Sequence, residues 1–192
     1  MSLFPKILAT ALAGAVLGLG ATYASLTRGI GFEAVKAGPW RGTPQISVVG
    51  GDPYARARVS RSGQVLLGTA EGLSFSAAVD STGARLRTGC DYRVSGATPV
   101  ARNWTLGLAR PDGTLIATPF ARYGFTSSEL LRDARGDFHI DIARAARPGN
   151  WLPLPGEGDF LLVLRLYDSP HSTSAKTLEA RELPTINAER CS

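Results

Sequence analysis

The chain has 192 residues, of which 44% are hydrophobic and 19% charged, and its formal net charge is +5. Lys6 and Arg28 supply two of these charges, so residues 32–192 carry 19 basic and 16 acidic side chains, a surplus of only three. The arginines are spread singly rather than clustered with aromatic residues, which argues against nucleic-acid binding. Beyond the first thirty or so residues, roughly 160 remain, enough for one domain with one core.

The N-terminal segment is long and apolar. Ile7 and Thr27 are the first and last of 21 consecutive uncharged residues between Lys6 and Arg28. At 1.5 Å per residue, a helix of this length spans the roughly 30 Å hydrocarbon core of a bilayer. We therefore predict a signal anchor that is kept in the mature protein. A signal peptide cleaved after Ala24 is the alternative.

The charges that flank this segment bear on its orientation. Lys6 and the amino terminus favour a cytoplasmic N-terminus, whereas Arg28 and Lys36 on the other flank oppose it. The preferred interpretation is a single-pass inner-membrane protein with its C-terminal domain in the periplasm.

The two cysteines of the chain, Cys90 and Cys191, agree with export. Neither belongs to a CxxC motif or to a Cys/His metal-binding spacing. We predict a disulfide between them, which closes a loop of about 100 residues and stabilises the fold by up to about 4–5 kcal/mol in the chain-entropy description. Two unrelated buried thiols are the alternative.

Composition divides the chain into three parts. Residues 1–28 form the predicted anchor, and residues 29–51 are rich in Gly and Pro and are predicted to be a linker. Residues 52–192 form the predicted β-sandwich domain. Trp40, although it lies in the linker, is expected to pack onto the domain.

Two short helices are expected within the domain. Asp52, followed by a proline, supplies an N-cap for a helix over residues 53–62. Thr126 and Glu129 have the spacing of a capping box, which predicts a second helix that ends at Gly136.

The dominant hydrophobic period beyond these signals is two, which indicates β-strands. The alternating apolar positions include Leu73, Phe75, Ala77, Val79, Tyr92, Val94, Trp104, Leu106, Leu108, Phe138, Ile140 and Ile142. Residues 160–167 are nearly all apolar, which favours a strand covered on both faces. Short strands separated by Gly and Pro predict a mainly β domain, an antiparallel sandwich or jelly roll with one or two short helices.

Five short segments resemble the bacterial domain of unknown function 1214, and the resemblance extends from about residue 52 to the C-terminus. The segments are CDYRVSG (90–96), ARNWTL (101–106), DG (112–113), GNWLP (149–153) and LRLY (164–167). The resemblance implies a jelly-roll-like β-sandwich, either as a short membrane-anchored protein or as the C-terminal half of larger envelope proteins.

In those larger proteins a domain of unknown function 1254 precedes the sandwich. The resemblance therefore implies that an activity requiring both halves needs a separate companion protein here. It carries over no activity and no catalytic residue.

One candidate site lies along a single predicted strand. Asp137, His139 and Asp141 alternate with apolar residues and supply the ligand types of a metal site or an acid/base pair. Residues that share a strand face are about 7 Å apart, so a tight metal site needs ligands from another strand. A solvated outer face is therefore the preferred interpretation, and no metal is predicted.

A second candidate is a ligand pocket around Arg165, with Trp104 and Trp151 as apolar walls and Asn150 beside them. A charge inside an apolar run needs a carboxylate or carbonyl partner, or must point outward. Arg165 either holds a neighbouring strand or the loop at residues 150–153, or recognises an anion at the mouth of the sandwich.

Catalytic motifs are missing from the sequence. It has no GxSxG elbow, HExxH motif, phosphate-binding glycine loop or dinucleotide fingerprint. We therefore predict a membrane-anchored envelope protein without a cofactor, a non-enzymatic binding or assembly module that works with a companion protein or a small ligand. The alternative is a hydrolytic or carbohydrate-directed enzyme, by analogy with other jelly rolls.

Overall fold

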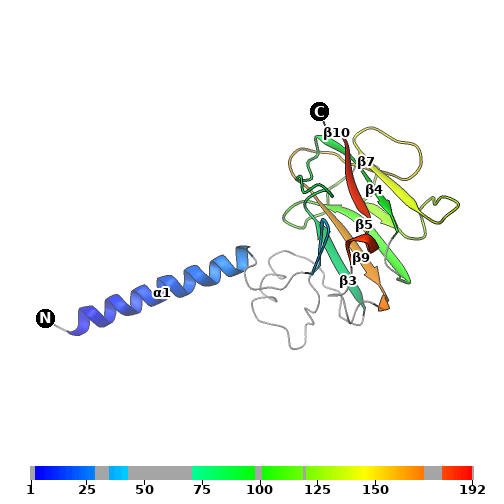
Figure 1. Ribbon diagram of the computed structural model, residues 1–192. Helices are drawn as coiled ribbons and strands as arrows, with labels where there is room; N and C mark the ends of the chain where they lie inside the picture. The colour runs from blue at the N-terminus through cyan, green and yellow to red at the C-terminus, as the bar shows by residue number, and fades with distance from the viewer. Residues whose placement is uncertain are drawn as a thin grey trace.

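The computed structural model describes residues 3–28, 35–42, 71–97, 101–118, 120–170 and 179–191. In these residues a long N-terminal helix, α1 (Leu3–Arg28), precedes a β-sandwich (Figure 1). The strands are β1 (Val35–Ala37), β2 (Trp40–Gly42), β3 (Gly72–Ala77), β4 (Cys90–Gly96), β5 (Asn103–Ala109), β6 (Gly124–Thr126), β7 (Phe138–Ala143), β8 (Trp151–Pro153), β9 (Leu161–Tyr167) and β10 (Thr185–Cys191), with the 3-10 helix η3 (Ala180–Glu182) before β10.

Helix α1 contains the whole predicted membrane span. Its segment Leu3–Ser25 is apolar and long enough to cross a membrane, and none of it is buried inside the protein. The polar Thr10 donates its hydroxyl to the carbonyl of Lys6 at 2.5 Å, so its hydrogen bond is satisfied within the helix. Signal sequences share this length and composition, so retention of the anchor stays a prediction.

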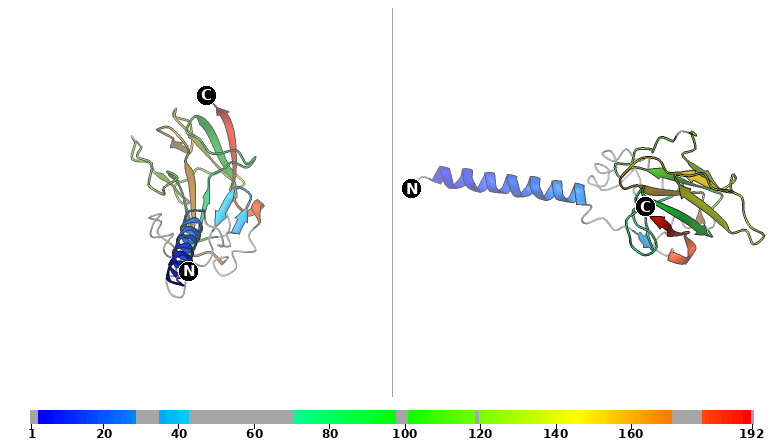
Figure 2. Two further views of the ribbon diagram at one scale, coloured as in Figure 1. Left: turned by 90° about the vertical axis from the view of Figure 1, so that its left-hand side faces the viewer. Right: turned by 90° about the horizontal axis from the view of Figure 1, so that it is seen from above.

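Two sheets form the sandwich, which Figure 2 shows from two further directions. The larger sheet has the strand order β1-β2-β3-β9-β5-β6, and the smaller has the order β10-β4-β7-β8. Neighbouring strands are antiparallel, except that β7 and β8 run parallel. The mainly β sandwich predicted from the sequence is confirmed.

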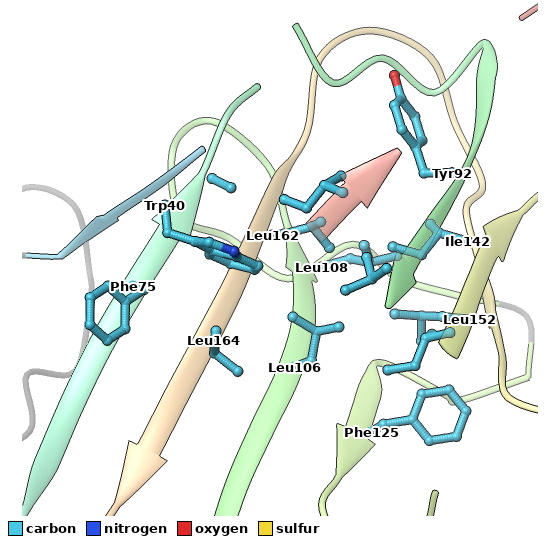
Figure 3. Packing of buried hydrophobic residues seen from close by; sticks show 14 of the residues in the cluster. Trp40, Phe75, Tyr92, Leu106, Leu108, Phe125, Ile142, Leu152, Leu162 and Leu164 are labelled. Atoms are coloured by element: carbon cyan, nitrogen blue, oxygen red, sulfur yellow. The ribbon is translucent and has the colours of Figure 1, made fainter. Parts of the chain in front are cut away.

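Apolar side chains of both sheets meet between the layers. In Figure 3, Leu106 and Leu164 of the larger sheet lie between Phe75 of the same sheet and Ile142 and Leu152 of the smaller sheet. All five are at most 1% exposed. Each such side chain contributes about 1.5–3 kcal/mol through its removal from water, so this layer is the main stabilising feature of the fold.

Strand β9 is buried on one face only. Its residues Leu162, Leu164 and Leu166 are fully buried, whereas the four residues that alternate with them are partly exposed. The prediction of a strand covered on both faces is therefore wrong. The small sheet covers one side of β9, and the other side presents its alternate residues outward because successive side chains point to opposite faces.

The predicted linker at residues 29–51 contains regular structure. Within it, β1 and β2 form a hairpin whose second strand pairs with β3. Gly38, with φ of +61°, occupies the turn in a conformation that favours glycine. Trp40 is completely buried, as expected, and lies in β2, next to the edge strand of the larger sheet. The rest of the linker and the predicted helix at 53–62 lie outside the described residues.

The helix predicted from Thr126 to Gly136 is not formed. One capping contact exists, since the Thr126 amide donates to Glu129 Oε2 at 3.0 Å, and the Glu129 amide closes a turn by donating to the Thr126 carbonyl at 3.1 Å. The chain then leaves the turn because Asn150 hydrogen-bonds both the amide and the carbonyl of Leu131, each at 2.8 Å. A backbone engaged by a distant side chain is not available for helical hydrogen bonds.

Asp80 organises the turn that follows β3. Its Oδ1 accepts hydrogen bonds from the amides of Thr82 and Ala84, both at 2.9 Å, and from the Thr82 hydroxyl at 2.6 Å. The carboxylate is only 3% exposed. Burial raises the pKa of Asp80, but the hydrogen bonds from Thr82 and Ala84 outweigh it and hold the pKa below its ordinary value near 3.8.

We expect Asp80→Ala to lower the free energy of unfolding by about 1–3 kcal/mol at neutral pH. Because the folded pKa is lower than the unfolded pKa, this contribution is complete above about pH 5 and is lost as the pH falls through the folded pKa. Urea unfolding of both proteins over this range measures the difference. A difference that stays constant into strong acid contradicts the assignment, and Asp80→Asn provides a non-titrating control of similar shape.

Candidate functional site

The residues of the predicted ligand pocket do not share one cavity. Trp104 is 3% exposed and packs in the core, with its ring centroid 5.1 Å from that of Phe138. Arg165 lies on the outer face of the larger sheet, where it pairs across the strands with Ser74 and Thr105. Since Trp104 and Thr105 are successive residues of β5, they point to opposite faces, and Arg165 lies with Thr105.

Asn150 has a structural position. It is 3% exposed, and its side-chain amide bonds the backbone of Leu131 at both ends and the carbonyl of His139 at 2.9 Å. These contacts join the segment before β7 to the start of β8 and use most of the hydrogen-bonding capacity of the amide.

Trp151 lies next to Asn150 but points to the rim of the sandwich. Its indole Nε1 donates to the Ala143 carbonyl at 3.0 Å, and its ring meets Phe120 edge-on at a centroid distance of 5.5 Å. The ring is partly exposed. Of the four predicted pocket residues, Trp151 is the one at an accessible rim with an exposed aromatic neighbour.

The three polar residues predicted to share a strand face are separated by their partners. His139 is exposed, and Asp137 lies 3.8 Å from Arg135. Asp141 is 8% exposed and forms an ion pair with Arg93 at 2.8 Å. Among the described residues no group of three or more His, Cys, Asp or Glu side chains is placed to hold a metal ion.

Asp141 belongs to a charged groove on the outer face of the smaller sheet. The groove has a volume of about 300 Å³. It is lined by Asp91, Tyr92, Arg93, Asp141, Ala143, Arg147, Glu189 and Arg190. These residues come from β4, β7, β10 and the loop after β7, so distant parts of the chain converge on it.

The charges of the charged groove are paired with one another. Arg93 contacts Asp141 at 2.8 Å and Glu189 at 3.3 Å, and the hydrogen bond that its guanidinium donates to Asp141 raises the pKa of Arg93. Asp91 accepts from Arg147 at 2.6 Å and from Arg190 at 3.2 Å. Three guanidinium groups thus face three carboxylates, and this balance suits a polypeptide surface of mixed charge better than a single small ion.

The Cys90–Cys191 disulfide, predicted from the sequence, is present at one end of the charged groove. The two cysteines are directly opposite each other in the pairing of β4 with β10. Asp91 and Arg190, the residues beside them, form one of the ion pairs of the groove. The disulfide therefore fixes the strand that supplies Glu189 and Arg190.

An exposed apolar surface adjoins the charged groove. Phe120 is 65% exposed and its ring meets that of Trp151 in β8, and Leu131 is 68% exposed and its backbone amide is bonded by Asn150, the residue before β8. We call Phe120, Leu131 and Trp151 the apolar edge. Trp151 pairs in register with Asp141 of the groove, so the two surfaces are neighbours. Exposed aromatic and aliphatic groups next to paired charges are typical of protein interfaces.

The sequence indicates Trp151 and Asp141 as candidate residues but not the surfaces to which they belong. Alternation along β4 indicates that Asp91 and Arg93 share a face. Their partners at Glu189 and Arg190 are about a hundred residues away, and no local signal connects them. The hydrophobic pattern of the sequence likewise does not indicate that Phe120 is exposed.

Comparison with known families identifies the domain. Residues 71–171, more than half of the chain, match a family described as a protein of unknown function, DUF1214. The chain belongs to the DUF1214 family. No curated protein matches this DUF1214 protein.

Two solved structures resemble the DUF1214 protein. The VPA0106 protein from Vibrio parahaemolyticus is 19% identical, with a TM-score of 0.61 over 99% of this chain and 47% of its own. An uncharacterised protein from Burkholderia cenocepacia is 18% identical, with a TM-score of 0.46 over 89% of this chain and 40% of its own. The DUF1214 protein thus spans about half the length of the Vibrio protein, and the likeness to that protein shows the fold alone.

Proposed function

We propose that this DUF1214 protein is a membrane-anchored binding module, which presents its sandwich in the periplasm and docks a companion protein through the apolar edge and the charged groove. The observation that carries the proposal is the apolar edge, where Phe120 and Leu131 each leave about two thirds of their surface exposed.

Helix α1 and the disulfide support the proposed location. Leu3–Ser25 is long and apolar enough to cross a bilayer. The Cys90–Cys191 bond suits an oxidising compartment such as the periplasm. Together they support one span with the domain outside the cytoplasm.

The companion is suggested by the length of the fold relative. The chain covers 47% of the Vibrio protein, so that protein has a further half beside the part that resembles the sandwich. We infer that a protein resembling that further half is the companion. A surface that such a half covers is exposed when the half is not bound, and the apolar edge fits this description.

A binding role also agrees with the chemistry of the charged groove. Its carboxylates are engaged by Arg93, Arg147 and Arg190. Paired charges of this kind orient and select a partner surface more readily than they transfer protons. The described residues offer no observation that favours the hydrolytic or carbohydrate-directed alternative.

Replacement of Phe120 and Leu131 by serine is expected to reduce the amount of companion protein recovered with the full-length chain by at least about tenfold, because truncation of central apolar contacts costs about 2 kcal/mol or more each. The measurement is quantitative mass spectrometry after purification from membranes in mild detergent.

The matched control replaces Leu161 and Val163 by serine, since both are partly exposed apolar residues on the outer face of the other sheet. The control is expected to retain the companion. Equal recovery with the two double variants contradicts the proposed docking surface. Thermal unfolding of each variant verifies that the sandwich is intact.

A further inference from the structure

The outer face of the larger sheet carries basic side chains and no acidic ones among its described strand residues. The strand residues on this face are Lys36, Arg41, Gly72, Ser74, Ser76, Asn103, Thr105, Gly107, Ala109, Gly124, Thr126, Leu161, Val163, Arg165 and Tyr167. We call Lys36, Arg41 and Arg165, with the Ser and Thr hydroxyls between them, the basic face.

Lys36 and Arg41 are directly opposite each other in the β1–β2 hairpin. Both are exposed, and neither makes an ion pair with another described residue. Like charges directly opposite on neighbouring strands are destabilising, so this hairpin keeps an unfavourable pair. An external anion removes that repulsion.

Arg165 continues the basic face two strands further across the sheet. Arg41 pairs in register with Ser76, and Arg165 pairs with Ser74 on the same strand, β3. Arg165 also has no ion-pair partner within the described part of the chain. Hydroxyls of Ser74 and Ser76 therefore lie between unpaired cations, an arrangement of donors that suits phosphate oxygens.

The opposite face of the sandwich does not share this imbalance. In the charged groove three guanidinium groups are matched by three carboxylates. The charged groove thus lacks the excess of positive charge found on the outer face of the sheet that begins with β1.

The chain length between α1 and β1 limits how far the basic face can lie from the membrane. Only residues 29–34 separate Arg28, the last residue of α1, from Val35. Eight steps of at most about 3.5 Å put the Cα of Lys36 within about 28 Å of that of Arg28. Glu33 is the one acidic residue in the connection, against Arg28, Lys36 and Arg41.

We propose that the basic face binds the phosphate headgroups of anionic phospholipids in the membrane that α1 spans. The inference rests on the anchoring stated above and not on the companion protein. Each Lys or Arg near an anionic surface shifts the equilibrium by roughly fivefold, so three such residues favour the docked orientation by roughly a hundredfold. The charged groove, on the opposite sheet, is thereby left free for a protein partner.

The test uses the full-length chain in nanodiscs of phosphatidylcholine alone or of phosphatidylcholine with an equimolar share of phosphatidylglycerol. Amide hydrogen exchange is measured in peptides that cover β1–β2 and β9. We expect exchange there to be at least about tenfold slower in the anionic discs, and the difference to disappear at high salt.

Lys36→Gln, Arg41→Gln and Arg165→Gln combined are expected to abolish the lipid dependence. The control combines Arg110→Gln, Arg135→Gln and Arg144→Gln, which removes the same charge from exposed positions outside the basic face. The inference is overturned if the wild-type chain exchanges equally in the two lipids. It is also overturned if the control variant loses the lipid dependence to the same extent as the variant of the basic face.

Failure of the wild-type chain to elute with nanodiscs overturns the anchoring and the inference with it. Lipid-independent exchange in a chain that does enter the discs overturns the inference alone. Neither outcome depends on recovery of a companion protein.

Discussion

Trp40→Ala is expected to lower the free energy of unfolding by about 3–5 kcal/mol, the range for removal of a buried aromatic side chain. The indole is completely buried, and its Nε1 donates to the Pro184 carbonyl at 2.7 Å. Pro184 comes directly before β10, so this one side chain fastens the β1–β2 hairpin to the last strand of the other sheet.

Chemical unfolding of the full-length chain in detergent, followed by circular dichroism, measures the effect. Trp40→Phe serves as the control, because it keeps most of the apolar volume and loses the hydrogen bond, and we expect a smaller loss of about 1–2 kcal/mol. An alanine variant within 1 kcal/mol of the wild type shows that the hairpin is not part of the cooperative fold.

Loss of the Cys90–Cys191 disulfide is the second change with a large expected effect. The sequence separation of the cysteines is 101 residues, for which the chain-entropy description gives a stabilisation of about 4–5 kcal/mol. The bond also fastens the end of β10, whose outer half is exposed. Its loss is expected to release Glu189 and Arg190 from the charged groove.

The double variant Cys90→Ser with Cys191→Ser is compared with the wild type before and after reduction. We expect the reduced wild type and the variant to unfold at the same lower denaturant concentration, and the variant to be insensitive to reductant. Unfolding curves for oxidised and reduced wild type that coincide contradict a stabilising role. The amount of companion protein recovered from the same samples shows whether binding through the charged groove requires the disulfide.

The two experiments separate the roles of the two sheets. Trp40 anchors the hairpin that carries Lys36 and Arg41, so its loss acts first on the basic face. The disulfide acts first on the charged groove. We expect Trp40→Ala to lose the lipid dependence and the cysteine variant to lose companion binding.

Local patterns account for the parts of the fold that sequence reasoning predicted correctly. Alternation in β4 and β5 identified strands because side chains of a strand point to opposite faces. The apolar segment of α1 was identified because spanning a bilayer requires only length and the absence of charge. Sequence reasoning also paired Cys90 with Cys191, since no other cysteine exists.

Predictions from local patterns are wrong where a contact with a residue distant in sequence determines the structure. The capping box at Thr126 makes its turn, but Asn150 takes the backbone of Leu131 and the helix does not follow. Gly38 and its neighbours have the composition of a linker, but because Trp40 is buried they form part of the larger sheet. In both cases the deciding partner is separated in sequence from the segment that it controls.

The sequence by itself determined a long apolar helix, a β-rich domain and a single pair of cysteines, because periodicity, hydropathy and cysteine number are properties of neighbouring residues or of composition. Only the tertiary structure decided that Arg165 and Trp104 lie on opposite faces of the larger sheet. It also decided that Asp91, Asp141 and Glu189 share one groove, since that depends on the order in which distant strands pair. The apolar helix can thus be identified from the sequence, whereas the surfaces proposed for lipid and protein exist only after folding.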